Sequence, residues 1–160
     1  MSDYKIELIK SENEHLDILY KFQTDKEANY LAAFTAKDPN DKSAYVAKYS
    51  KLLADPTINN RTILVNGQVA GSIAKFLIQN DAEITYWIAK EFWGKGIASK
   101  ALNLFLEIEQ TRPLFARAAF DNYRSQKVLE NNNFEKVGSD SGFAEARQEE
   151  IVEFIYKLSQ

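Results

Sequence analysis

Apolar and polar positions along the chain alternate between a period of two, typical of strands, and the wider spacing of helices. The strand-like segments are 4–9, 62–65, the run beginning at Val69, 82–89, 114–120, 134–139 and 151–158. Helical spacing or capping signals predict helices over 11–23, 41–53, and from 97 to about 108. The stretch 26–40 has apolar residues without a clean period. Strands and helices that alternate in this way predict an α/β fold (mixed α+β).

Turn and cap signals fix several of these boundaries. Asn66-Gly67 between two apolar runs predicts a β-hairpin. The sequence Ser11-Glu-Asn-Glu14 has the form of a capping box and predicts the start of the first helix. Asp41 can cap the next helix, which Asp55-Pro56 ends. In the last strand, alternate residues fall on one face, namely Val152, Phe154, Tyr156 and Leu158.

Composition narrows the function classes. A length of 160 residues predicts one domain, 1–160. The net charge of −3 and the lack of a basic stripe argue against nucleic-acid binding. Without cysteine and with His15 as the one histidine, the chain lacks a thiol nucleophile and the residues for a typical metal centre, and His15 is expected to be an ordinary surface residue. No signal peptide or long apolar span is visible, so we expect a cytoplasmic protein that does not enter a membrane.

The segment 91–100 carries the strongest chemical signal. Gly94 and Gly96 lie between an apolar strand and an amphipathic helix. Glycines allow close approach of a ligand, and the free amides of a first helical turn attract anions, so we expect a phosphate or pyrophosphate here. The spacing does not fit a dinucleotide fingerprint, because position 99 is Ser, nor a nucleoside-triphosphate loop, because Lys95 precedes a glycine. A plain tight turn would also explain both glycines.

Two motifs resemble those of the GNAT N-acetyltransferases. Trp93-Gly94-Lys95-Gly96-Ile97-Ala98 is similar to their acetyl-CoA pyrophosphate loop, Gln/Arg-x-x-Gly-x-Gly/Ala, with Trp93 in place of Gln or Arg. That replacement is familiar in the branch resembling the ribosomal-protein N-terminal acetyltransferases (RimJ/RimL-like). Asn122 and Ser125 match the Asn-x-x-Ser/Ala motif that follows the next strand, and Asn133-Phe134 replaces the usual Gly-Phe. The resemblance covers about residues 82–138.

The resemblance implies a GNAT fold, with a mostly antiparallel mixed sheet of six to seven strands, a splayed central pair, and helices on both faces. It also implies acetyl-CoA as the co-substrate, held between the strand 83–89 and the strand 114–120, and no metal. The residues implied in cofactor binding are Trp87, Ile88, Ala89, Trp93, Gly94, Lys95, Gly96, Ile97, Ala98, Ser99, Asn122, Ser125 and Lys127, with Lys100 and Arg124 as further phosphate contacts.

The implied reaction is direct attack of a neutral amine on the thioester, which needs a base and an acid. Family members place a tyrosine seven residues after the motif Asn as the acid, but Leu129 stands there, so Ser125 is the alternative. Glu83 and Glu145 are the candidate bases, and an ordered water chain is a third option. Structural roles stay open as well: Asn122 suits a helix cap, Glu83 an ion pair, and Glu145 a solvated loop.

We therefore expect an N-acetyltransferase that moves the acetyl group to a primary amine of a small molecule or a protein N-terminus. A small acceptor is favoured, because no peptide-docking insertion is evident. Specificity is expected to lie in 26–56, where Tyr30 and Phe34 can line the acceptor pocket. Dimers are common in such families, so a homodimer is expected to be accessible. The alternatives are a non-catalytic acyl-CoA-binding module and a nucleotide-binding domain without CoA chemistry.

Overall fold

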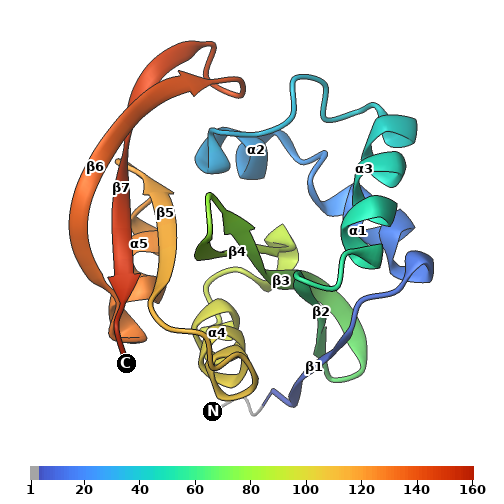
Figure 1. Cartoon of the computed structure of the whole chain (residues 1–160). Helices are drawn as coiled ribbons and strands as arrows, with labels where there is room; N and C mark the ends of the chain where they lie inside the picture. The colour runs from blue at the N-terminus through green and yellow to red at the C-terminus, as the bar shows by residue number, and fades with distance from the viewer. Residues whose placement is uncertain (1–3) are drawn as a thin grey trace.

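The computed structural model describes residues 4–160, and within them a single mixed sheet of seven strands carries helices on both of its faces (Figure 1). The strands are β1 (Ile6–Lys10), β2 (Asn59–Val65), β3 (Gln68–Ile78), β4 (Asp81–Ile88), β5 (Leu114–Ala119), β6 (Glu135–Ala144) and β7 (Glu149–Leu158). Their order across the sheet is β1-β2-β3-β4-β5-β7-β6. Neighbours are antiparallel except for the parallel pair β4–β5. The predicted fold class is confirmed.

Helices cover both faces of the sheet. They are the 3₁₀ turns η1 (Asn13–His15) and η2 (Lys90–Phe92) and the helices α1 (Leu16–Phe22), α2 (Lys26–Ala32), α3 (Lys42–Ala54), α4 (Ile97–Ile108) and α5 (Tyr123–Asn131). Side chains alternate along β4, so Ile84 and Ile88 join the core beneath α4 while Glu83 and Trp87 face the side of α1 and α3. Within residues 4–160, none of these helices is long and apolar enough to cross a lipid bilayer.

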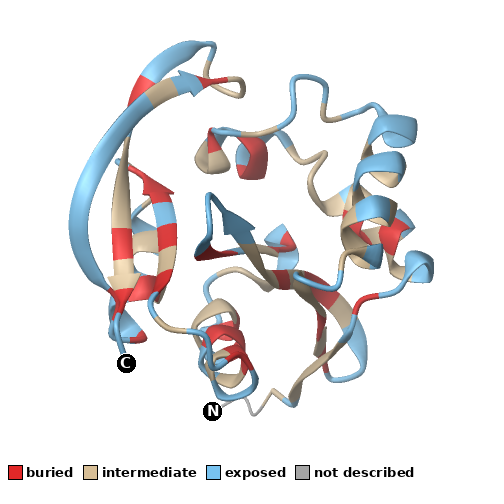
Figure 2. Ribbon diagram, in the orientation of Figure 1, coloured by how far each residue is buried: buried red, intermediate tan, exposed pale blue. Residues whose placement is uncertain are grey.

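The main core lies between the sheet and α4. Leu102 and Phe105 of α4 are fully buried against Ile73 of β3 and Leu114 of β5. Burial of each such side chain stabilises the fold by roughly 1.5–3 kcal/mol. By contrast, β6 is exposed along most of its length, as Figure 2 shows. The core therefore fixes α4, and with it the start of α4, against the middle of the sheet.

The central pair of strands is splayed, as the resemblance implied. Pairing of β4 with β5 is limited to Ala82 with Leu114 and Glu83 with Phe115. Beyond these pairs the two strands diverge (Figure 1), and the edge of β4 from residue 84 onward has no strand beside it. Backbone groups on that edge are thus available to a ligand.

The first helix begins differently from the prediction. Glu12, not Ser11, is the N-cap, and it forms the capping box with His15, whose Nδ1 accepts from the Glu12 amide at 3.0 Å. The hydroxyl of Ser11 is instead buried, 2.9 Å from the Thr62 hydroxyl of β2. His15 is therefore a capping residue and not an ordinary surface residue.

The segment 26–40 is not irregular throughout, because α2 forms over its first half. Asp25 caps it by accepting from the Ala28 amide at 2.8 Å, and Ala28 and Asn29 are buried. A helix of only two turns depends on its cap and its tertiary contacts, which periodicity cannot reveal. The hairpin at Asn66-Gly67 and the Asp41 cap of α3 are confirmed.

Candidate active site

The glycine segment forms an uncapped start to α4. Gly94 and Gly96 have φ values of +75° and +74°, a region that side chains with a Cβ rarely adopt. A Cβ added at either position would meet no protein atom within 4 Å, so open space lies beside both residues. No side chain caps the helix, and the amides of its first turn face that space as an anion site.

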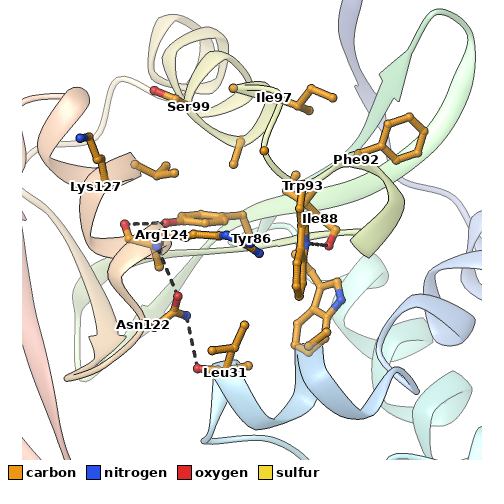
Figure 3. Close-up of a pocket in the computed structure, with 18 of the residues that line it drawn as sticks. Leu31, Tyr86, Ile88, Phe92, Trp93, Ile97, Ser99, Asn122, Arg124 and Lys127 are labelled. Carbon is orange, nitrogen blue, oxygen red and sulfur yellow. Dashed lines mark hydrogen bonds between the residues drawn. The ribbon is translucent and has the colours of Figure 1, made fainter.

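A pocket of about 400 Å³, here called the glycine pocket, lies beside this turn (Figure 3). Its walls contain most of the residues implied in cofactor binding: Trp87, Ile88, Trp93, Gly94, Gly96, Ile97, Ala98, Ser99, Asn122, Ser125 and Lys127. Ala89 and Lys95 lie outside the lining, and the Ala89 amide is already bonded to the carbonyl of Ala70 at 2.8 Å. That amide is not free to bind a pantetheine arm.

Basic side chains, without acidic ones, face the glycine pocket. Arg124 and Lys127 of α5 line it, and no Asp or Glu does among the described residues. The Arg124 guanidinium lies 4.6 Å from the ring centre of Trp93, whose Nε1 donates to the Ile88 carbonyl at 2.9 Å (Figure 3). This arrangement suits a ligand that carries several negative charges.

Asn122 caps α5, so the structural role considered for it is confirmed. Its Oδ1 accepts from the Ser125 amide at 3.3 Å, and its Nδ2 donates to the Leu31 carbonyl of α2 at 3.3 Å (Figure 3). Asn132, at the other end of α5, donates to the carbonyl and the hydroxyl of Ser99, both at 3.2 Å. The walls on both sides of the glycine pocket are thus held by amide side chains.

Tyr86 is a functional candidate that the sequence did not reveal. Its Oη lies 2.7 Å from the Ser125 hydroxyl, and burial raises its pKa to about 12 (Figure 3). In the pattern of β4, Tyr86 shares a face with Ile84 and Ile88 and reads as a core residue. Leu129, at the position where the family has its tyrosine, is fully buried and has no group to donate a proton.

A second pocket, of about 660 Å³, lies on the opposite side of the splayed strands and is here called the aromatic pocket. Its lining includes Phe22, Phe34, Tyr45, Tyr49, Phe76, Glu83, Arg117 and Glu153. It shares five residues with the glycine pocket, namely Ala32, Tyr86, Trp87, Asn122 and Ser125. The two pockets therefore meet where β4 and β5 diverge.

Glu83 lies in the aromatic pocket, nearly buried at 8% exposure. Burial raises the pKa of this carboxyl, the Arg117 guanidinium at 3.4 Å lowers it, and the charges of Glu153 and Asp81 raise it further, with a net rise. Arg117 also donates to Glu153 at 2.8 Å and to Asp140 at 3.4 Å. A carboxylate with a raised pKa in a cleft suits a general base.

Glu145 lies apart from this arrangement. It is in the turn between β6 and β7, half-buried, and lines neither the glycine pocket nor the aromatic pocket. Its carbonyl accepts from the Gln148 side chain at 2.6 Å. The structure therefore brings Glu83 and Ser125 to one pocket and leaves Glu145 outside it.

The neighbouring Arg147 connects three segments and holds α2 in place. Its side chain is 2% exposed, and its two terminal nitrogens donate to the Asp121 carboxylate at 2.8 and 2.9 Å. Its Nε donates to the Tyr30 carbonyl at 2.6 Å, and its guanidinium lies 4.0 Å from the Tyr30 ring centre. Because α2 contributes Ala32 to both pockets, Arg147 fixes the wall that they share.

Comparison with known proteins agrees with this geometry. Residues 5–135 match the family described as an acetyltransferase (GNAT) domain. The uncharacterized N-acetyltransferase p20 of Bacillus licheniformis is 24% identical over 164 residues, covering 96% of this chain and 92% of the relative. The putative ribosomal N-acetyltransferase YdaF of Bacillus subtilis (strain 168) is 32% identical over 117 residues, covering 66% of this chain and 63% of the relative.

The fold is also similar to that of a solved structure. The microcin C7 self-immunity acetyltransferase MccE, crystallised in complex with acetyl-CoA and AMP, superimposes with a TM-score of 0.81 at 18% identity. The similarity covers 98% of this chain and 93% of that one. Within residues 4–160, no group of three or more His, Cys, Asp or Glu side chains is placed to hold a metal ion.

Proposed function

The chain belongs to the GNAT family of acetyltransferases and uses acetyl-CoA as its acetyl donor, and we propose that it acetylates the primary amine of a small molecule held in the aromatic pocket. The observation that carries this proposal is the meeting of the two pockets at Tyr86, Trp87, Asn122 and Ser125. A thioester placed at that junction is accessible to an amine from the opposite side.

The cofactor would extend from the start of α4 to the junction of the pockets. Its pyrophosphate would bind the amides between Trp93 and Ala98, where the glycine turn and the helix dipole favour an anion. Arg124 and Lys127 would contact the remaining phosphate oxygens. The pantetheine arm would lie along the unpaired edge of β4, because an extended chain can hydrogen-bond there as a strand would.

The reaction begins with an ammonium group in the aromatic pocket, which must become a neutral amine before it can attack. Glu83, directly or through a water molecule, takes the proton of the incoming ammonium group. The amine nitrogen then attacks the acetyl carbon, the new C–N bond forms, and the C–S bond breaks. The raised pKa of Glu83 supports its assignment as the base, because it brings the carboxylate closer to the working pH.

The departing thiolate needs a proton, and Ser125 with Tyr86 is the proposed donor. The short contact between the two hydroxyls lets Tyr86 pass a proton to Ser125 as Ser125 protonates the sulfur. Burial raises the pKa of Tyr86, so its hydroxyl is protonated at physiological pH and can donate to Ser125. With this pair as the proposed donor, the absence of a tyrosine at position 129 does not argue for the alternative of a non-catalytic acyl-CoA-binding module.

A small acceptor fits the aromatic pocket better than a protein N-terminus does. A volume of about 660 Å³ lies within the usual range for sites that bind small molecules, about 300–1,000 Å³. The pocket is lined by residues of α1, α3 and the segment 34–41 as well as by residues of the sheet. The name of the relative YdaF makes a protein N-terminus the second candidate.

Thermal unfolding with acetyl-CoA, CoA and ATP in parallel tests the cofactor assignment. Saturation at about a hundredfold above the Kd should stabilise the protein by roughly 2.7 kcal/mol with acetyl-CoA and CoA but not with ATP. Thiol release measured with a panel of amines and N-terminal peptides then tests turnover. Binding of CoA without thiol release from any acceptor would reject catalysis, and turnover confined to peptides would reject the small acceptor.

A further inference from the structure

The aromatic pocket carries an excess of negative charge. Its lining includes four carboxylates, Asp38, Asp41, Glu83 and Glu153, and two cationic side chains, Lys48 and Arg117. Asp38 and Asp41 accept backbone amide bonds at 3.0 Å each, which satisfies an oxygen without neutralising the charge. These four carboxylates are here called the acidic wall, and a ligand that enters the pocket meets their negative charge.

The two cations of the lining differ, because Arg117 is held by carboxylates and Lys48 is exposed. Arg117 has carboxylates around it on three sides, since it contacts Glu83, Glu153 and Asp140 within 3.4 Å. This cluster of one guanidinium and three carboxylates remains negative. Lys48 is exposed on α3, 5.5 Å from the ring centre of Tyr49, and Asp38 and Asp41 are exposed as well, so water and salt screen all three charges. The less exposed carboxylates Glu83 and Glu153 therefore carry most of the negative charge that a bound ligand meets.

Aromatic rings form the rest of the lining. Seven aromatic side chains face the pocket: Phe22, Phe34, Tyr45, Tyr49, Phe76, Tyr86 and Trp87. Tyr45 and Tyr49 form a tilted pair with ring centres 4.3 Å apart. Burial raises the pKa of both hydroxyls, so they remain neutral at physiological pH. Such rings bind apolar groups and attract cations through their faces.

We infer that the acceptor is a cationic amine with an aromatic or bulky apolar body and without a carboxylate group. This inference rests on the proposed function, because it takes the aromatic pocket as the acceptor site. The ammonium group would be attracted by the acidic wall, and the body of the molecule would pack among the rings. The amine then loses its proton and forms the amide as the C–S bond of acetyl-CoA breaks, and CoA leaves as the thiol.

A carboxylate on the acceptor is the feature that the pocket rejects. Like charges placed together in a binding site cost several kcal/mol, which makes repulsion an effective basis for specificity. An α-amino acid carries its carboxylate next to the amine, so that group would enter the pocket with the nucleophile. The amine made by removing the carboxylate keeps the same body and escapes the repulsion.

Three matched acceptors separate charge from size: phenethylamine, phenylalanine and phenylalanine amide. Phenylalanine and its amide have nearly the same volume and differ in charge. In a thiol-release assay we expect kcat/KM for phenethylamine and for the amide to exceed that for phenylalanine by about tenfold or more, or about 1.4 kcal/mol. If size and not charge determined the preference, kcat/KM for the amide would be as low as that for phenylalanine. That result would overturn the inference.

A variant of the acidic wall tests the same point from the side of the protein. Glu153→Gln removes a negative charge and one of the three carboxylates around Arg117, so the preference for the amide over phenylalanine should fall several-fold. Glu107→Gln changes an exposed carboxylate of α4 outside both pockets and should leave the preference as it is. An unchanged preference in Glu153→Gln would overturn the role of the wall.

These experiments distinguish a failure of the acceptor inference from a failure of the proposed function. If kcat/KM for phenylalanine equals or exceeds that for phenethylamine, the acceptor inference is overturned and the assignment as an acetyltransferase stands. If none of the three is acetylated, binding to the CoA-loaded protein is measured by calorimetry, and no preferential binding of the two carboxylate-free amines would also overturn it. No thermal shift with acetyl-CoA together with no thiol release would reject the proposed function itself.

Discussion

The two pockets that meet at the splayed strands differ in charge and in origin. The glycine pocket is formed by backbone amides at the start of α4 and by the basic residues Arg124 and Lys127, and no carboxylate lines it within the described chain. The aromatic pocket is formed by side chains from distant elements, and acidic groups outnumber basic ones in its lining. They share only a few residues around Tyr86 and Ser125.

This difference shows how one fold can keep its cofactor and vary its acceptor. A site built from backbone amides needs only glycines and a helix start, which few substitutions can alter. A site built from side chains changes with each residue that lines it. The sequences around the aromatic pocket should therefore determine specificity, while the glycine pocket serves the shared chemistry.

Replacement of Glu83 should have the largest effect and should be confined to the aromatic pocket. Glu83→Gln removes the proposed base, so kcat should fall by about 10²–10⁴-fold while the Kd for acetyl-CoA stays unchanged. Because the carboxyl acts as a base only when it is deprotonated, wild-type kcat/KM should fall as the pH drops through the raised pKa of Glu83, and the variant should not show this fall. If the fall disappeared in Glu145→Gln instead, Glu145 would be the base.

Loss of Arg147 should disturb the wall that both pockets share. Arg147→Gln breaks the ion pair between the buried Arg147 guanidinium and the half-buried Asp121 carboxylate and removes the bond to the Tyr30 carbonyl. It should lower the free energy of unfolding by about 3 kcal/mol, measured by urea denaturation at pH 7. Arg147 lowers the pKa of Asp121, so the wild type has this stabilisation above the unfolded-state pKa and loses it as the pH falls through the lower folded-state pKa. The difference between the two proteins should therefore shrink in acid, and a difference independent of pH would contradict this account.

Substitution in the glycine turn before α4 should affect the glycine pocket alone. Gly96→Val places a branched side chain at a positive φ and in the space proposed for the pyrophosphate, so the Kd for acetyl-CoA should rise by about a hundredfold, or about 2.8 kcal/mol. Gly138→Val is the matched control, since its Cβ also meets open space but its φ is not positive. Equal losses of binding in the two variants, measured by calorimetry, would indicate that the turn does not hold the cofactor.

Removal of the Tyr86 hydroxyl tests the junction itself. Tyr86→Phe keeps the ring in the core and removes the hydrogen bond to Ser125, so kcat should fall by about tenfold with Ser125 still present. The Kd for acetyl-CoA should not change. Because Ser125 would remain the direct donor to the sulfur, Ser125→Ala should lower kcat at least as much, and the double variant should add little. Additive losses would show that the two hydroxyls act independently.

The smallest effect is expected from the basic rim of the glycine pocket. Arg124→Gln removes one positive charge and the contact with Trp93, so acetyl-CoA should bind about fivefold more weakly at low salt, and less so at high salt. Lys51→Gln changes an exposed cation on α3 that lines neither pocket and should have no effect on binding. An equal loss at low and high salt would argue against an electrostatic role for Arg124.

Local sequence determined most of the elements of this protein and its glycine turn, with α2 and the exact start of the first helix as exceptions. Asn66-Gly67, Asp41 and the spacing of α4 each act within a few residues, so the hairpin, the α3 cap and the helix could be predicted. The same holds for Gly94 and Gly96, because glycine is the residue that adopts a positive φ at the least cost. The parts of the candidate site that depend on the backbone could therefore be predicted from the sequence.

Only the tertiary structure decided the contacts between side chains that are distant in sequence. Tyr86 looked like a core residue, and only the divergence of β5 leaves its hydroxyl beside Ser125. Arg117 and Arg147 each find their carboxylates on other elements of the fold. Capping and turn formation depend on neighbours along the chain, whereas these contacts depend on which strands and helices pack together. For that physical reason the acidic aromatic pocket could not be predicted from the sequence alone.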